Sequence, residues 1–255
     1  MSQPCRSVYI FAKANNIPFN NHEVLLFKGE CYDLMDMNFS VLGASPLGEH
    51  LSEEFSKVNP LRKVPFLKDG DFTMAESTAM LLYLANKYKT PDHWYPCDLQ
   101  KRARVDEYLA WQHTNTRPHC SKLFWVKVMT PFLLGHEAEP EKLDPVLTEF
   151  NTTLTAIEEK FLGGKPFIAG DEMSIADLVA IVEIMQTIAG GIDAFENKPK
   201  LADWKNRVED AIGAALFKEA HEKVLRVKDM QNMPIPPELK ERLRARLQQF
   251  PLMKL

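Results

Sequence analysis

Residues 2–5 of the 255-residue chain, Ser-Gln-Pro-Cys, have the spacing of a Cys-x-x-Cys motif in which serine replaces the first cysteine. They open the first predicted helix, where free N–H groups and the helix dipole favour an anion such as a thiolate. The Ser2 hydroxyl cannot exchange disulfides, but it can donate a hydrogen bond to the thiolate of a bound molecule and lower that thiol's pKa. The plainer alternative is an N-capping serine beside a buried Cys5.

Val64-Pro65 is a second candidate site, directly before a predicted strand. A cis proline at this position turns the preceding backbone outward. The freed N–H and C=O groups of Val64 can then pair with a peptide-like ligand. The alternative is an ordinary trans proline at the entry to a strand.

Glu76-Ser77 is a third candidate, at the predicted start of another helix. The hydroxyl and backbone N–H of Ser77 suit a carboxylate, and the acidic Glu76 suits an ammonium group. An α-amino acid head group carries both charges. The alternative is a capping serine beside a glutamate that stabilises the helix dipole.

The other polar residues give weaker indications. The seven histidines and four cysteines lack metal-ligand spacing, so we expect no metal site. Arg117 ends a predicted helix and can face a cleft between domains. Ser174 and Asp177 have the spacing of a capping box, which predicts a structural helix start.

The predicted elements that position these residues are a mixture of helices and strands in the first third of the chain and helices alone after it. Helical spacing covers 4–15, a short strand is predicted over 22–27, and a short helix over 53–57. Asp69-Gly70, between two short apolar runs, predicts a two-residue hairpin turn, and a helix follows over 76–88. After the proline-rich segment 90–97 the periodicity is helical throughout. Helices are predicted over 98–117, 120–134, 141–162, 174–189, 199–212, 214–227 and 236–249.

This order predicts an α+β protein of two domains. Residues 1–89 form a small α/β domain, 90–97 a linker and 98–255 an all-helical domain. One strand placed before the first helix would give βαβ followed by ββα, which is the thioredoxin topology. Composition agrees with a globular protein, at 45% hydrophobic and 26% charged residues, and the net charge of −4 argues against a nucleic-acid binder. With no long apolar run and few cysteines, we expect a soluble, cytoplasmic protein.

With these residues assembled, the chain resembles the cytosolic glutathione transferases, and among them the theta class. Long segments carry the resemblance, at 2–19, 58–78, 88–113 and 167–180. The resemblance implies a transferase that conjugates reduced glutathione to small hydrophobic electrophiles in detoxification, works as a homodimer and needs no cofactor beyond glutathione as co-substrate. The net charge of −4 and the lack of a long apolar run predict no nucleic-acid or membrane partner.

The resemblance also implies residue roles. Ser2 matches the serine that hydrogen-bonds the glutathione thiolate. The residues that match the glutathione-binding positions are His50, Lys63, Val64, Pro65, Glu76 and Ser77. Thr114 and Arg117 match a stretch that lines the electrophile side.

Two departures from the theta pattern bear on fold and activity. Theta members carry a strand before the catalytic serine, and here that serine is residue 2, so the domain is expected to lack its first strand. About 19 extra residues stand at 31–49, where apolar Met35 and Met37 alternate with polar neighbours. A central parallel strand is apolar on both faces, so we expect a mobile insertion or a misassigned gene segment rather than a replacement strand. The lost strand leaves an alternative function, a glutathione-binding or scaffold protein with impaired catalysis.

Overall fold

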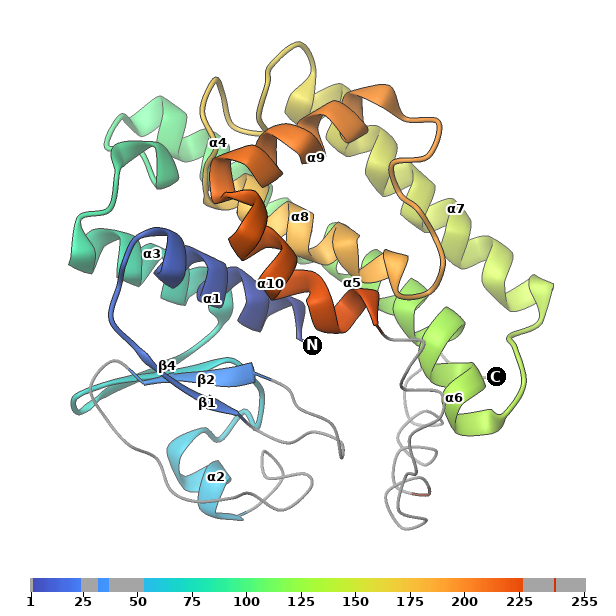
Figure 1. The fold of residues 1–255 in the computed structure, drawn as a ribbon, viewed down its shortest axis with the longest axis horizontal. Coiled ribbons are helices and arrows are strands. Elements are labelled where there is room, and N and C mark those ends of the chain that lie inside the picture. The colour runs from blue at the N-terminus through green and yellow to red at the C-terminus, as the bar shows by residue number, and fades with distance from the viewer. Residues whose placement is uncertain (1, 24–31, 37–52, 227–240, 242–255) are drawn as a thin grey trace.

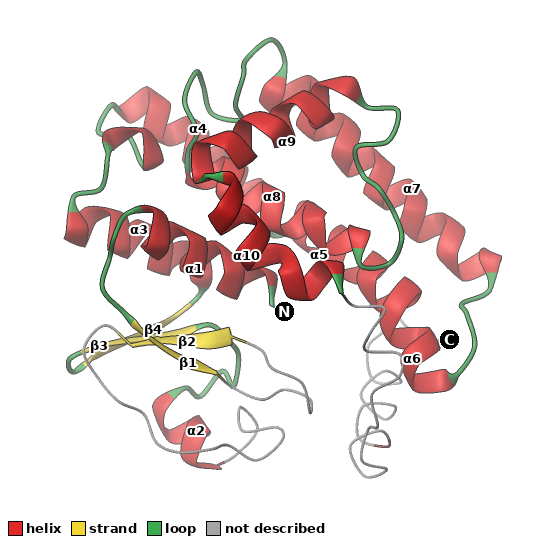
Figure 2. Cartoon of the chain, in the orientation of Figure 1, coloured by secondary structure: helices red, strands yellow, loops and turns green. Residues whose placement is uncertain are grey.

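The computed structural model describes residues 2–23, 32–36, 53–226 and 241. Figure 1 shows a small sheet with helix α2 on one side and helices α1 and α3 on the other. Most of the remaining helices lie beyond α1 and α3, so these two helices separate the sheet, whose strands are yellow in Figure 2, from the helical part.

The described residues of the sheet-bearing part form three helices and four strands. Their bounds are α1 Gln3–Ala14, β1 Asn20–Glu23, β2 Tyr32–Asp36, α2 Glu53–Val58, β3 Phe66–Asp69, β4 Phe72–Ala75 and α3 Ser77–Tyr88. The Val64-Pro65 peptide before β3 is cis, which is one of the two alternatives that the sequence left open.

The helical part follows a short 3₁₀ helix at Asp92–Trp94. Its α-helices are α4 Leu99–Gln112, α5 Thr116–Phe124, α6 Thr130–Leu134, α7 Pro140–Ala156, α8 Ile175–Ile188, α9 Pro199–Ile212 and α10 Ala214–Leu225, with π-helical turns at Trp125–Met129 and Ile157–Leu162. The helix predicted over 236–249 lies outside the described residues, apart from residue 241.

The sheet has the order β1-β2-β3-β4. Strand β2 runs antiparallel to β1 and parallel to β3, with Leu34 opposite both His22 and Phe66. Strands β3 and β4 form the predicted hairpin, but Asp69 pairs with Phe72, so the two-residue loop starts at Gly70 and not at Asp69. Gly70 has a φ of 60°, and glycine takes the first loop position because that position needs positive φ.

The prediction that the extra residues 31–49 do not supply a strand is wrong for Tyr32–Asp36. These residues occupy the central position of the sheet, between β1 and β3. Alternation of apolar and polar residues predicts how side chains are buried, whereas pairing depends on backbone N–H and C=O groups that both neighbouring strands must satisfy. Residues 37–49 lie outside the described part of the chain.

The predicted helix boundaries around residue 115 are also wrong. The chain leaves helix at residues 113–115 and starts α5 at Thr116, so the helix predicted over 98–117 is two helices. The side chain of Asn115 donates to the carbonyl of Trp111 at 2.9 Å, which satisfies one of the last free carbonyls of α4. The break places Arg117 in the first turn of α5.

One hydrophobic core runs through both parts of the chain. It joins Phe11 of α1 and Leu81 of α3 to Tyr108 of α4 and Ile181 of α8. Helix α8 is buried on every side over most of its length, as expected for a helix whose apolar residues do not form a single stripe. The division into domains at residues 89 and 98 stays a prediction.

The start of α8 contains the capping box that the sequence predicted. The Asp177 carboxylate is fully buried and accepts hydrogen bonds from the Ser174 N–H and hydroxyl, each at 3.0 Å. It also accepts from the Ile168 N–H at 2.8 Å and from the Trp204 indole N–H at 2.9 Å. A single carboxylate therefore joins α8, α9 and the preceding loop.

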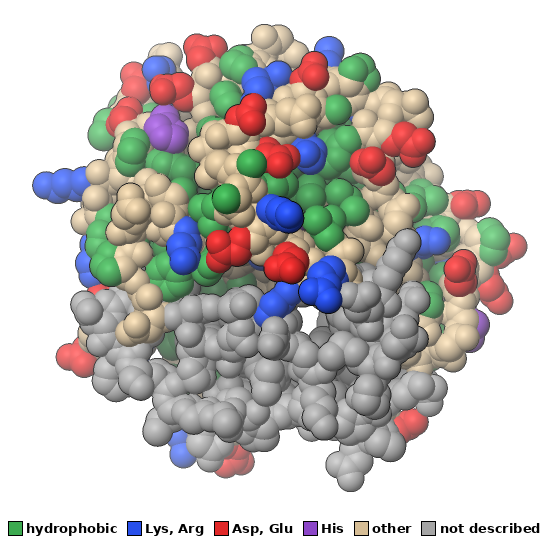
Figure 3. Space-filling model, viewed as in Figure 1, with side chains coloured by type: hydrophobic (Ala, Val, Ile, Leu, Met, Phe, Trp, Pro, Cys, Tyr) green, Lys and Arg blue, Asp and Glu red, His purple; other side chains and the backbone are tan. Residues whose placement is uncertain are grey.

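Two observations on the described residues concern a membrane span and the distribution of charge. Within the described ranges, every helix falls short of the length and hydrophobicity that a bilayer crossing requires. On the face shown in Figure 3, acidic and basic side chains are interspersed.

His221 on α10 is a buried titratable group, so stability is expected to depend on pH. Burial, with the nearby Arg6 and Lys205 charges, lowers the pKa of His221 to about 3, against an ordinary value of about 6.5. Between pH 6.5 and pH 3, His221 is therefore protonated in the unfolded chain and neutral in the folded chain. The folded state loses stability as pH falls through this range, because the unfolded state binds the proton. From pH 6.5 to 5 we expect the free energy of unfolding to fall by about 2 kcal/mol from this residue alone.

Urea unfolding at several pH values tests this expectation. His221→Leu should remove most of the pH dependence over this range, whereas His136→Gln, a change at an exposed histidine, should leave it intact. An identical pH profile for His221→Leu and the unsubstituted chain would contradict the assignment.

Candidate functional site

A cavity of about 240 Å³ lies where α1 and the sheet-bearing part meet α4, α5 and α8. Five of the predicted glutathione-binding residues line it, together with the predicted electrophile-side Arg117. The full lining is Pro4, Ser7, Lys63, Val64, Pro65, Glu76, Ser77, Gln112, His113, Arg117, Val179, Val182 and Glu183.

The loop that carries Lys63, Val64 and the cis Pro65 is held by a buried asparagine. The Asn59 side chain donates to the Lys63 carbonyl at 2.6 Å and accepts from the Leu61 N–H at 3.2 Å. Asn59 is only 1% exposed, so a buried side chain holds this loop in place. This anchoring role is visible only in the folded loop, because it depends on where the Asn59 side chain lies relative to the Lys63 carbonyl.

Glu76 and Ser77 lie next to each other in the cavity lining and can bind groups of opposite charge. Ser77 is the first residue of α3, so it stands among the free N–H groups of a helix start. Glu76 precedes it with a φ of 69°, a conformation that costs a non-glycine residue about 1–3 kcal/mol and that clusters at ligand sites. The pair can bind a carboxylate and an ammonium group side by side.

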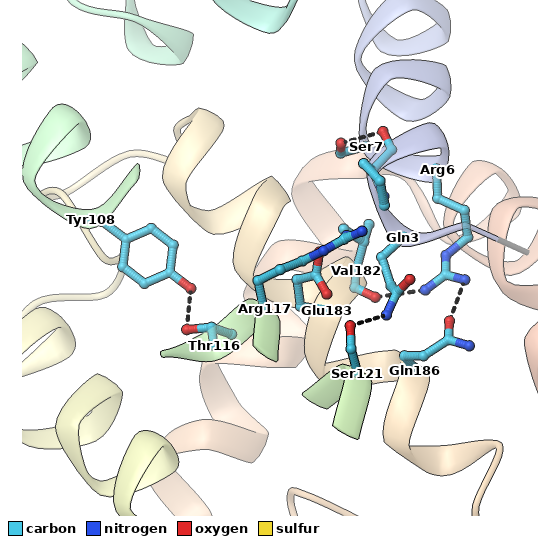
Figure 4. A network of polar contacts seen from close by, with 11 residues as sticks. Gln3, Arg6, Ser7, Tyr108, Thr116, Arg117, Ser121, Val182, Glu183 and Gln186 are labelled. Atoms are coloured by element: carbon cyan, nitrogen blue, oxygen red, sulfur yellow. Dashed lines mark hydrogen bonds and ion pairs between the residues drawn. The ribbon is translucent and has the colours of Figure 1, made fainter. Parts of the chain in front are cut away.

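Arg117 reaches the same cavity from α5 and is held by an acid on α8. Its guanidinium lies 2.5 Å from a carboxylate oxygen of Glu183, which is almost fully buried. Burial raises the pKa of Glu183, and the Arg117 charge partly offsets that rise. In Figure 4 the Arg117 side chain lies against Glu183 and extends toward α1.

Ser2 stands in a different pocket from the other predicted residues. A pocket of about 100 Å³ between α1 and α10 is lined by Ser2, Cys5, Arg6 and Tyr9 and by residues of α10. The Ser2 side chain makes no capping hydrogen bond, so its hydroxyl is not used by α1. The geometry of α1 explains why the two pockets are separate. Cys5, Arg6 and Tyr9 lie on one face of this helix, whereas Pro4 and Ser7 lie on another.

Arg6 joins α1 to α8 between these two pockets. It is 7% exposed, and its guanidinium donates to the Gln186 side chain at 2.8 Å and to the Val182 carbonyl at 2.6 Å. Gln3, also on α1, donates to the Ser121 hydroxyl of α5 at 3.3 Å, as Figure 4 shows. These contacts fix the start of α1 against the helical part.

Two predicted residues stay outside this arrangement. His50 lies outside the described residues, so its role stays a prediction. Thr114 is exposed and lines neither pocket. Among the described residues, no group of three or more potential metal ligands occurs.

Comparison with known proteins gives close relatives over the whole chain. A sequence model of the "Glutathione S-transferase, N-terminal domain" matches residues 1–92, and one of the "Glutathione S-transferase, C-terminal domain" matches 116–211. Glutathione S-transferase theta-1 of Gallus gallus is 50% identical in an alignment 253 positions long, and this alignment covers 95% of this chain and 93% of the relative.

Two solved human structures are similar as well. Human glutathione-S-transferase T1-1 in its apo form superposes with a TM-score of 0.84 at 51% identity, covering 96% of this chain and 93% of that one. Human glutathione transferase theta-2, solved in complex with glutathione, gives a TM-score of 0.83 at 42% identity, covering 98% and 96%.

These matches confirm the predicted fold class, a thioredoxin-like domain followed by a helical domain. The correction is that the described sheet has a strand, β2, at the position where the sequence predicted a missing one. The chain belongs to the glutathione S-transferase family, and within it to the theta class.

Proposed function

We propose that this chain is a glutathione transferase that conjugates reduced glutathione to small hydrophobic electrophiles. One observation carries the proposal, namely that Lys63, Val64, the cis Pro65, Glu76 and Ser77 line a single cavity. Glutathione is a tripeptide, so the backbone groups of Val64 can pair with its peptide backbone. Its amino-acid end carries an ammonium group and a carboxylate, which suit the Glu76 side chain and the helix start at Ser77. The complex of human theta-2 with glutathione supports this choice of ligand.

The chemistry depends on Ser2 and on the start of α1. Ser2 and Pro4 are two residues apart, so their Cα atoms are separated by at most about 7 Å. A tripeptide whose amino-acid end occupies the cavity beside Pro4 can therefore extend its thiol toward Ser2. The hydroxyl and the α1 N-terminus then lower the thiol's pKa from about 8.5. The thiolate attacks the electrophilic carbon, and the carbon–sulfur bond forms as the leaving group departs with its electron pair.

The alternative of an impaired glutathione-binding protein is disfavoured. It rested on the loss of the central strand, and β2 pairs with both β1 and β3 at that position. The relatives that match nearly the whole chain are also named as transferases.

We further propose a homodimer that works in the cytoplasm in detoxification, as the family resemblance implies. Three large apolar side chains support a contact with a second copy. Val58, Leu61 and Phe72 are 53%, 57% and 48% exposed on α2, on the loop after it and on the hairpin.

Two assays on the full chain test the catalytic proposal together. We expect retention on glutathione-agarose and conversion of a small halogenated hydrocarbon to its glutathione conjugate, followed by mass spectrometry. Retention without conversion would support the non-catalytic alternative, and the absence of both would reject glutathione as the ligand.

A further inference from the structure

The guanidinium of Arg6 connects the two pockets of the site. Arg6 lines the pocket that holds Ser2, and its Nη2 donates to the carbonyl of Val182 at 2.6 Å. Val182 in turn lines the cavity that holds Glu76 and Ser77. One side chain, which Figure 4 shows reaching from α1 to α8, therefore joins the pocket of Ser2 to the wall of the cavity.

Two contacts on one face of α8 hold this guanidinium. Besides the bond to Val182, Nη1 of Arg6 donates to Oε1 of Gln186 at 2.8 Å, and the two acceptor residues are four positions apart on the helix. A planar guanidinium that binds two fixed acceptors sets both the position and the rotation of the helix that carries it. A lysine ammonium at the same place would bind only as a point charge.

Ser2 stands one helical turn before Arg6 on α1. The Arg6 N–H donates to the Ser2 carbonyl at 3.1 Å, so Ser2 belongs to the same hydrogen-bonded turn as the anchored residue. A shift of α1 against α8 therefore moves the Ser2 hydroxyl relative to the cavity wall. The thiol must meet this hydroxyl while the rest of glutathione lies in the cavity, and a misplacement of about 1 Å can slow a reaction about 100-fold.

We propose that Arg6, held by Gln186 and Val182, is a positioning residue that sets where the Ser2 hydroxyl stands relative to the cavity, so that the hydroxyl reaches the glutathione thiol. The inference rests on the proposed function and deepens it, because it adds a residue that acts on the thiol through Ser2. Arg6 is only 7% exposed, so water competes little for its two bonds to α8. The contact is therefore strong enough to fix the start of α1.

A substitution at Gln186 in the full-length chain separates positioning from direct contact. Gln186 is 2% exposed and lines neither pocket, so it does not touch a ligand in them. Gln186→Met removes the acceptor with a side chain of similar size. The charged residues that line the Ser2 pocket stay in place, namely Arg6, Glu219, Glu222 and Lys223. Gln100→Met makes the same change at an exposed position of α4 and serves as the control.

At a pH below the thiol pKa, we expect Gln186→Met to lower kcat for glutathione conjugation about tenfold and to raise the pKa of the bound thiol by about 1. The two effects agree, because in that range a rise of about 1 in the pKa lowers the thiolate fraction about tenfold. Above the raised pKa, kcat should return toward that of the unsubstituted chain, since the thiolate is then formed in both. KM for glutathione should change less than about twofold, because Lys63, Glu76 and Ser77 lie on other elements.

Arg6→Lys tests the same contact from the other side. It keeps the positive charge but not the planar fork that binds two acceptors, so it should lower kcat and raise the thiol pKa as Gln186→Met does. Arg104→Lys, at an exposed arginine of α4, should match the unsubstituted chain, as should Gln100→Met. Urea unfolding shows whether each variant is folded, and if one of the two test variants is not, the other decides.

Three outcomes separate the positioning role from the proposed function. Unchanged kcat and thiol pKa in a folded Gln186→Met or Arg6→Lys variant would overturn the positioning role. A fall in kcat by the same factor at every pH, with an unchanged thiol pKa, would also overturn it, because that result indicates a structural role that does not act on the thiol. Absence of conjugation by the unsubstituted chain would instead reject the proposed function itself.

Discussion

Replacing Ser2 with alanine is expected to lower kcat/KM for glutathione conjugation by about 100-fold or more. Removing one hydrogen-bond donor to a developing or stabilised anion typically costs a factor of 10²–10³. The side chain of Ser2 makes no capping hydrogen bond, so its loss should leave α1 folded. The effect should therefore appear in reactivity and not in stability.

Titration of the bound thiol distinguishes this role from a structural one. The ultraviolet absorbance of the thiolate, followed against pH with glutathione bound, should show a higher thiol pKa in Ser2→Ala than in the unsubstituted chain. Ser2→Thr keeps a hydroxyl and should retain most activity. Ser56→Ala changes a serine that lines neither pocket and should have no effect. Unchanged kcat/KM in Ser2→Ala would remove Ser2 from the mechanism.

Replacing Asp177 with alanine is expected to have the largest effect on stability. The substitution leaves four buried donors, from Ser174, Ile168 and Trp204, without their acceptor. At about 1–3 kcal/mol for each unpaired buried group, reduced by local relaxation, we expect a loss of about 4 kcal/mol or more. Urea unfolding followed by tryptophan fluorescence measures this change.

Two further variants define the origin of that loss. Asp203→Ala removes an exposed carboxylate next to Trp204 and should change the free energy of unfolding by less than about 0.5 kcal/mol. Asp177→Asn keeps one acceptor oxygen and should fall between the two. A loss below 1 kcal/mol in Asp177→Ala would mean that the network does not hold α8 and α9 together.

Local patterns in the sequence were sufficient for most elements and for several site residues. The helix from Gln3, the hairpin around Gly70 and the capping box at Ser174 each depend on residues close together in the chain. Such features are predictable because capping, turn and periodicity preferences act within a few residues.

Predictions that depended on distant contacts were wrong or incomplete. The strand at Tyr32–Asp36 was not expected, because its place follows from pairing with two strands far from it in sequence. The break before Thr116 was misplaced because the predicted helices end and begin on either side of Pro118, whereas α5 contains this proline in its first turn, where proline is tolerated.

The sequence by itself determined the family, most of the helices and the β3–β4 hairpin, since these are recorded in residue types and short spacings, and it predicted residues for glutathione binding. Only the tertiary structure decided which of those residues meet. It put Lys63 and Glu76 beside Gln112 and Glu183, and it turned Ser2 toward α10 on another face of α1. No short-range pattern contains that information, because a cavity between helices is made by residues that are far apart in the chain and are brought together by the shared core.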